Sequence, residues 1–204
     1  MTNEIRIDDL AAPVLSDIQR MGIEYGEAKQ TDLTLDAICE AAVAVTGLDD
    51  FGDVDFCERL ELQLTEMNED EDRTGLGRML MKVDCLRYAS NRLKIEDLLK
   101  RHPEILEIEI AKPVIVIGLP RSGTTNLVNL LAADSRFRSM PLWESYEPVA
   151  DAREALGADG VDGVDPRWSR CQQAWESMQV GAPFVAAMHP MEPDHVHEEN
   201  ELMA

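Results

Sequence analysis

The residues with the clearest chemical capacity form the stretch GLPRSGTT, which begins at Gly118. Gly123 has no Cβ, so the backbone can approach an anion closely at that point. Arg121 carries a guanidinium that can hold two phosphate oxygens through parallel hydrogen bonds. The hydroxyl donors of the stretch are Ser122, Thr124 and Thr125. Together these residues predict a loop that binds a phosphate or a similar anion.

The sequence on either side of this loop is that of a strand followed by a helix. Before it, residues 113–117 (PVIVI) form a continuous apolar run, partly β-branched, of the kind that a strand buried on both faces requires. After it, apolar residues recur at helical spacing at Leu127, Val128, Leu130 and Leu131. A helix N-terminus offers unpaired N–H groups and the positive end of the helix dipole. The order strand, loop, helix therefore predicts an anion held at the start of the helix.

The spacing of Gly118 and Gly123 is also that of the nucleotide triphosphate loop, so a P-loop nucleotide kinase or NTPase is an alternative. That loop continues with Lys and then Ser or Thr, whereas Thr124 stands at the lysine position here. The basic group comes earlier, at Arg121. The sequence also lacks a recognisable second strand that ends in a metal-binding Asp, and both features disfavour the NTPase interpretation.

The stretch PRSGTT, residues 120–125, resembles the 5'-phosphosulfate-binding loop of sulfotransferases that use 3'-phosphoadenosine 5'-phosphosulfate (PAPS). Further similarity to a bacterial branch of that family lies in TGLDDFGD (46–53), RLKIEDLLKRHPEI (92–105), LLAADSRFRSMPLWESYEP (130–148) and HPMEPD (189–194). The resemblance covers residues 45–204. It implies a P-loop-like α/β fold, PAPS as co-substrate, a hydroxyl or amine acceptor of the sulfuryl group, and no metal.

The resemblance also implies roles for individual residues. Arg121 and the backbone amides of Ser122, Gly123, Thr124 and Thr125 would hold the 5'-phosphosulfate, and Arg121 would stabilise the charge that develops on the leaving oxygen. Glu144 is the first candidate for the base that removes the acceptor's proton, and His189 is the second. A structural ion pair of Glu144 with Arg136 or Arg138 is an open alternative.

A second group of polar residues lies near the end of the sequence. It comprises His189, Asp194, His195, His197, Glu198 and Glu199. No second ligand group with a recognised zinc spacing accompanies it, and the segment has the composition of a solvated acidic loop, so we expect no metal. Four aromatic residues either line an acceptor pocket or pack in the core, namely Trp143, Tyr146, Trp168 and Trp175.

The elements that carry these residues fall into two regions. Residues 1–110 are predicted to be mainly helical, with one helix that begins at Leu35 and is capped by Gly47. A second helix follows Asp53, and a third runs from Leu76 to His102, where the next residue is a proline.

Residues 111–204 are predicted to form the first part of an α/β domain, a parallel sheet with helices on both faces. Besides residues 113–117, only residues 137–142 suggest another strand. Because such a sheet needs several parallel strands, we expect the 204 residues to be the N-terminal portion of a longer protein and to be inactive alone. A non-catalytic fragment of a sulfotransferase homologue is a further alternative.

Composition limits the class of partner and the compartment. The formal charge of -21 would repel a phosphate backbone, which argues against binding to nucleic acid or to an anionic membrane surface. No apolar run approaches the roughly 18 residues of a membrane span. The four cysteines are scattered without a C-x-x-C pair, and we therefore expect reduced thiols in a cytoplasmic protein.

Overall fold

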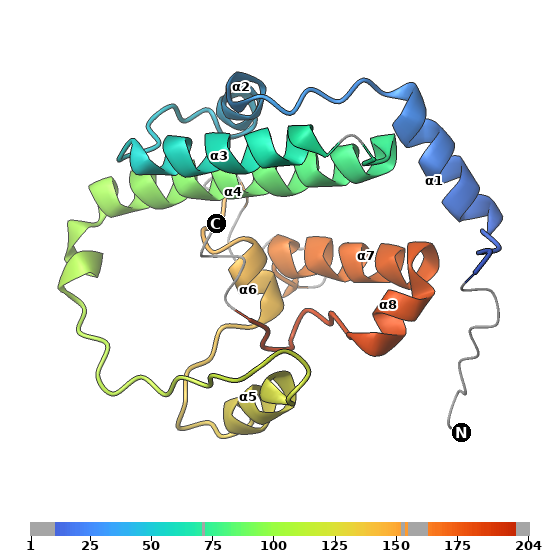
Figure 1. Ribbon diagram of the computed structural model, residues 1–204. Coiled ribbons are helices and arrows are strands. Elements are labelled where there is room, and N and C mark those ends of the chain that lie inside the picture. Colours follow the sequence, from blue (N-terminus) through green and yellow to red (C-terminus); the bar gives the residue numbers. More distant parts are fainter. Residues whose placement is uncertain (1–10, 71, 152–153, 155–162, 199–204) are drawn as a thin grey trace.

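The computed structural model describes residues 11–70, 72–151, 154 and 163–198, and its regular elements are all helical. They are α1 (Asp17–Ala28), α2 (Leu35–Thr46), α3 (Asp55–Glu69), α4 (Gly75–Arg101), the 3-10 helix η1 (Pro103–Glu107), α5 (Thr124–Ala132), α6 (Leu142–Tyr146), α7 (Pro166–Gly181) and α8 (Pro183–Met188). Figure 1 shows α2, α3 and α4 together at one side, and α6, α7 and α8 grouped on the other side of α4. Helix α5 lies apart, at the end of a long extended segment.

The first helices begin and end where short polar side chains and glycine allow it. Ser16 and Gln19 form a reciprocal capping box at the start of α1. Thr34 caps α2 through the N–H of Ala37, and Gly47 ends that helix with a left-handed φ of 74°. The predicted helix from Leu35 to its cap at Gly47 is therefore confirmed. The long helix α4 ends at Arg101, before Pro103, as its sequence predicts.

One buried apolar cluster joins α2, α3 and α4. Its members are Leu33, Ile38, Ala42, Phe56, Leu60, Leu64, Cys85, Ala89 and Leu93. Within each helix they recur three or four residues apart, so each helix turns one apolar stripe toward the others. This cluster makes the helical part that begins with α2 a packed unit and supports α4. Asn91 of α4 in turn donates to the carbonyl of Tyr146, at the end of α6, at 2.7 Å.

The predicted parallel sheet with helices on both faces is wrong: none of the residues that the structure describes forms a β-strand. Residues 113–117 belong to an extended segment, residues 108–119, in which Val114, Ile115 and Ile117 are 59%, 73% and 88% exposed. Residues 137–142, the other candidate, lead into α6 without strand pairing. A strand exists only where a neighbouring chain accepts and donates its backbone hydrogen bonds. An apolar run alone does not supply that neighbour.

Helix α1, which the sequence patterns did not predict, crosses α4 at a contact between two backbones. A Cβ built on Gly26 would lie 2.3 Å from the backbone N of Leu76 and 2.5 Å from its Cα. At the same crossing, a Cβ built on Gly75 would lie 2.4 Å from the carbonyl oxygen of Gly26. Two glycines therefore permit an approach that any side chain would block.

Substitution of these glycines provides a test of the crossing. We expect Gly26→Ala to lower the free energy of unfolding by roughly 1–3 kcal/mol, because the helices must separate to admit the methyl group. Gly22→Ala is the matched control, since its Cβ would meet only the Leu76 side chain, at 3.9 Å. It should raise stability by roughly 0.5–1 kcal/mol through helix propensity. Equal urea midpoints for the two variants would contradict the α1–α4 contact.

Candidate functional site

The loop between the extended segment and α5 is a tight turn with two residues in the left-handed region. Arg121 has a φ of 63° and Gly123 a φ of 95°. The Ser122 N–H donates to the carbonyl of Leu119 at 3.2 Å, and the Ser122 hydroxyl donates to the same oxygen at 2.6 Å. A left-handed φ is rare outside glycine, and at Arg121 it fixes the direction in which the guanidinium leaves the chain.

The two glycines of the loop have different roles. A Cβ on Gly118 would lie 2.7 Å from Cγ2 of Thr124 and 2.8 Å from Oγ of Ser122, so the loop folds directly over that position. A Cβ on Gly123 would meet nothing within 4 Å. The approach of an anion to Gly123 stays a prediction. Within the chain itself the crowding lies at Gly118, and the left-handed φ of Gly123 favours glycine at that position.

The loop borders a cavity of about 740 Å³. Its lining residues are Gly118, Leu119, Pro120, Arg121, Gly123, Thr124, Thr125, Asn126, Asn129, Met188, His189, Pro190, His195 and Glu198. Four of the five predicted binding residues thus face one space. Ser122 is not part of the lining, because its hydroxyl closes the turn on Leu119.

This cavity combines two sources of positive potential. Gly123 is the N-cap of α5, so the first N–H groups of that helix lie beside the loop and have no carbonyl one turn earlier to accept them. Arg121 adds a full charge, and its Nη2 donates at 3.3 Å to the carbonyl of Met188 on the opposite wall. In a chain with a net charge of -21, this local arrangement is what an anion would recognise.

The amide side chain of Asn129 holds residues 189–198, which we call the histidine segment, against α5. Nδ2 of Asn129 donates to the carbonyls of Thr125 and Val196, each at 2.8 Å. Oδ1 of Asn129 accepts from the N–H of Val196 at 3.0 Å. This clamp brings residues 67 positions away in the sequence to the mouth of the loop.

The histidine segment is also bonded to α6 and α7. The N–H of Leu142 donates to the carbonyl of His195 at 2.7 Å, and the N–H of Trp143 donates to that of Pro193 at 3.2 Å. Nε1 of Trp168 donates to a carboxylate oxygen of Asp194 at 3.0 Å. With the Asn129 clamp, these bonds fix the segment between three helices, and the expectation of a freely solvated loop does not describe it.

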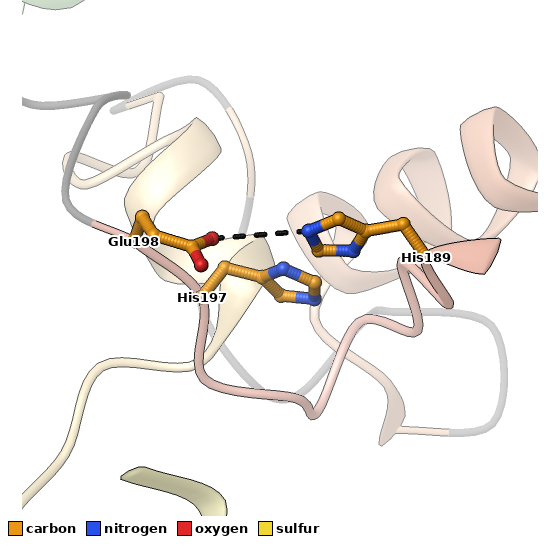
Figure 2. Close-up of side chains that lie close together, drawn as sticks. All are labelled: His189, His197 and Glu198. Atoms are coloured by element: carbon orange, nitrogen blue, oxygen red, sulfur yellow. Dashed lines mark ion pairs between the residues drawn. The ribbon is translucent and has the colours of Figure 1, made fainter. Parts of the chain in front are cut away.

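Within the segment, polar side chains meet the loop. Oγ1 of Thr125 donates to Oε1 of Glu198 at 2.9 Å, and Oε2 of Glu198 lies 3.9 Å from Nε2 of His189. Figure 2 shows His189, His197 and Glu198 turned toward one another. Burial and the neighbouring His189 lower the pKa of His197 to about 4. Burial opposes ionisation of Glu198, but hydrogen bonds from the backbone and Thr125 and the nearby histidines hold its pKa below the ordinary value.

The two candidate bases occupy different surroundings. His189 lines the cavity together with Arg121. Glu144, in the first turn of α6, forms an ion pair with Arg138, and it is not among the residues that line the cavity. The structure therefore realises the alternative that the sequence left open for Glu144. Its neighbour Trp143 stacks 4.7 Å from the guanidinium of Arg167 and borders a second, smaller cavity of about 360 Å³.

The part of the chain that contains the cavity is similar to a known protein family. The family model of the sulfotransferase family matches residues 113–204, a span that contains both the loop and the histidine segment. This part of the chain is therefore similar to the sulfotransferase family. A comparison with curated proteins finds no match.

Two sulfotransferase crystal structures have a similar fold. Sulfotransferase STF9 from Mycobacterium avium matches with a TM-score of 0.67 and 27% sequence identity, over 85% of this chain and 44% of that one. Sulfotransferase STF1 from Mycobacterium tuberculosis H37Rv matches with a TM-score of 0.66 and 24% identity, over 83% of this chain and 46% of that one. The chain thus spans less than half the length of either structure.

The Asn129 clamp leads to a prediction about stability. We expect Asn129→Asp to lower the free energy of unfolding by roughly 1–3 kcal/mol, because two carbonyls lose their donor and face a negative charge instead. Hydrogen exchange at the N–H of Val196 should accelerate.

The control is Asn126→Asp, the same charge change on the same helix outside the clamp. It should alter stability by no more than about 0.5 kcal/mol. If the two variants show the same stability and the same exchange at Val196, Asn129 does not hold the histidine segment.

Proposed function

We propose that this protein is a sulfotransferase that moves a sulfuryl group from PAPS to a hydroxyl or amine acceptor. The observation that carries the proposal is the shared cavity: within a segment of the sulfotransferase family, an anion-binding loop and a histidine line the same space. Sulfuryl transfer needs both a fixed anion site and a group that accepts the acceptor's proton.

The loop residues bind the donor in this proposal. Backbone N–H groups from Gly123 to Thr125, at the start of α5, hold the 5'-phosphosulfate, and the left-handed backbone of Gly123 permits that arrangement. Arg121 contacts the bridging oxygen, on which negative charge grows as the S–O bond breaks. A donor already in position there stabilises the transition state more than the bound substrate.

His189 takes the proton of the acceptor. His189 lines the same cavity as Arg121. The residue before it, Met188, accepts a hydrogen bond from Arg121 through its carbonyl oxygen, which keeps the two side chains near each other. Glu198, beside His189, favours the imidazolium that forms when the proton is transferred. Glu144 is committed to Arg138, and its role is to hold the chain that follows α5. As the attack proceeds, the acceptor oxygen bonds to sulfur, its proton passes to His189, and adenosine 3',5'-bisphosphate leaves.

The setting is a cytoplasmic enzyme in which residues 111–204 carry the chemistry and the helical residues 1–110 support them. Cys39, Cys57, Cys85 and Cys171 are all free thiols, which fits a reducing compartment. Burial raises the pKa of Cys171 to about 11, so this thiol is unreactive at neutral pH. No helix in the described part of the chain is long and apolar enough to cross a membrane.

Arg121 provides the main test of the function. In the complete protein, Arg121→Ala should reduce transfer from radiolabelled PAPS to phenol, alcohol and amine acceptors by about 10²–10³-fold, with a smaller change in PAPS affinity measured by calorimetry. Arg121→Lys keeps the charge and loses the two-pronged contact, so its turnover should be intermediate.

Two outcomes would count against this assignment. A variant that loses only affinity would reduce Arg121 to a binding residue. A wild-type protein that does not bind PAPS, but hydrolyses ATP when magnesium is added, would remove the sulfotransferase function altogether.

The choice of base is tested by a pair of substitutions that preserve side-chain shape. His189→Asn should retain PAPS affinity and lower turnover by about 10²–10⁴-fold, because the amide cannot accept the proton. Glu144→Gln should stay within a few-fold of wild type and lower the unfolding midpoint through the lost ion pair with Arg138. The reverse pattern of turnover would assign the base to Glu144.

A further inference from the structure

Three side chains with metal-ligand chemistry converge at the edge of the cavity. His189 follows α8, and His197 and Glu198 are the last two described residues of the histidine segment (Figure 2). One ring nitrogen from each histidine and one carboxylate oxygen of Glu198 all lie within 4.8 Å of one another. Sequence spacing could not show this, because His189 reaches the other two only through the turn of residues 190–196.

The distances between these groups suit an ion better than a direct contact. Nε2 of His189 and Oε2 of Glu198 are 3.9 Å apart, which is too long for a hydrogen bond. Bonds of about 2.0–2.2 Å from a central ion to nitrogen and oxygen place two ligand atoms roughly 3–4 Å from each other. The three donors need to move inward only slightly to meet one ion.

His197 supplies an independent observation. The residue is 8% exposed, and its Nε2 is buried without a hydrogen-bond partner among the described residues. An unsatisfied buried polar atom is costly, so native sites that contain one commonly bind something that satisfies it. The ring lies stacked on that of His189, with 5.2 Å between the centroids, so the two imidazoles are neighbours.

The carboxylate is already oriented for this purpose. Oε1 of Glu198 accepts from Oγ1 of Thr125 at 2.9 Å, and Oε2 is thereby turned to the histidines. Hydrogen bonds of this kind to ligand side chains are the usual outer support of metal sites. Here that support comes from the anion-binding loop itself.

We propose that His189, His197 and Glu198 form a binding site for one divalent transition-metal ion of the zinc class. Two imidazoles and one carboxylate suit zinc, cobalt or nickel, whereas magnesium and calcium prefer oxygen ligands alone. The site borders the loop cavity, since His189 and Glu198 line it. All three ligands belong to the group of polar residues near the end of the sequence, and the fold brings them within reach of one ion.

The site has a regulatory consequence that rests on the proposed function. An imidazole that binds a metal through one nitrogen carries its proton on the other, so metal-bound His189 has no lone pair left for the acceptor's proton. Zinc therefore inhibits sulfuryl transfer, and removal of zinc by a chelator restores it.

The test separates metal binding from catalysis. The 204-residue chain, stripped with a chelator, is titrated with Zn²⁺ in a calorimeter and with Co²⁺ in an absorption spectrometer. We expect one ion per chain, and Co²⁺ bands typical of low coordination number. His189→Asn and Glu198→Gln alter partly exposed side chains and should each weaken Zn²⁺ binding at least ~10-fold, with unchanged circular dichroism.

Two further histidines serve as matched controls. His195 lies in the same segment and is paired with Glu192, and His102 is paired with Glu104 at the end of α4. His195→Asn and His102→Asn should bind Zn²⁺ within about two-fold of wild type, as expected for sites outside the ligand set.

The outcomes distinguish the two proposals. Failure of the wild type to bind one Zn²⁺, or equal affinity in the ligand variants and the controls, would overturn the metal site whatever the transfer assay shows. One bound Zn²⁺ with the expected loss in the ligand variants supports the metal site. If the complete protein then transfers sulfuryl groups equally well with Zn²⁺ bound, the role of His189 as base is wrong and the metal site stands.

Discussion

The amide side chain of Asn129 is the constraint on which the site depends. It is one turn into α5, and two of its three hydrogen bonds tie that helix to the carbonyl and the N–H of Val196. The third goes to the carbonyl of Thr125 on the same helix. Loop and histidine segment are otherwise joined only by single contacts, such as that between Thr125 and Glu198. Without the amide, the two sides of the cavity would keep the bond of Arg121 to the Met188 carbonyl and that of Thr125 to Glu198, and would lose both bonds to the backbone of Val196.

The electrostatics of the site are local rather than global. The chain has 40 acidic and 19 basic residues, so an approaching anion meets repulsion until it reaches the loop. Even there, Glu198 presents a carboxylate whose pKa is held low. Arg121 and the N-terminus of α5 must outweigh it, and they do so over short distances, where screening by salt is weakest. In the proposed function, the anion must therefore contact both groups at once.

Sequence patterns predicted what is encoded locally. The helices α2 and α4 follow from apolar spacing with a glycine cap or a proline at their ends, and the loop before α5 follows from Gly118 and Gly123. The prediction of a sheet was wrong because residues 113–117 show only an apolar run. Such a run does not indicate whether another strand lies beside it to pair with. Helix α1 was missed because Gly22 and Gly26 lower its helix propensity, while the backbone contact that needs Gly26 involves a residue 50 positions away.

The same limit applies to the site. Glu198 lies between His189 and Thr125 and contacts both. This arrangement depends on a hydrogen bond between residues far apart in the sequence, which spacing rules do not predict. The turn-closing bond of Ser122 is local, yet its direction depends on the left-handed backbone at Arg121, which a sequence motif does not reveal.

At Arg121, the left-handed backbone lowers stability, whereas the proposed activity requires the arginine side chain. A non-glycine residue in this region loses about 1–2 kcal/mol relative to its preferred conformation. Glycine at position 121 would relieve the backbone strain but would also remove the guanidinium. The substitution that makes the loop most stable is therefore the one that removes its charged group. Selection for thermal robustness alone would erode this position, and a stabilised variant obtained by random mutagenesis is a poor guide to the residues that the chemistry requires.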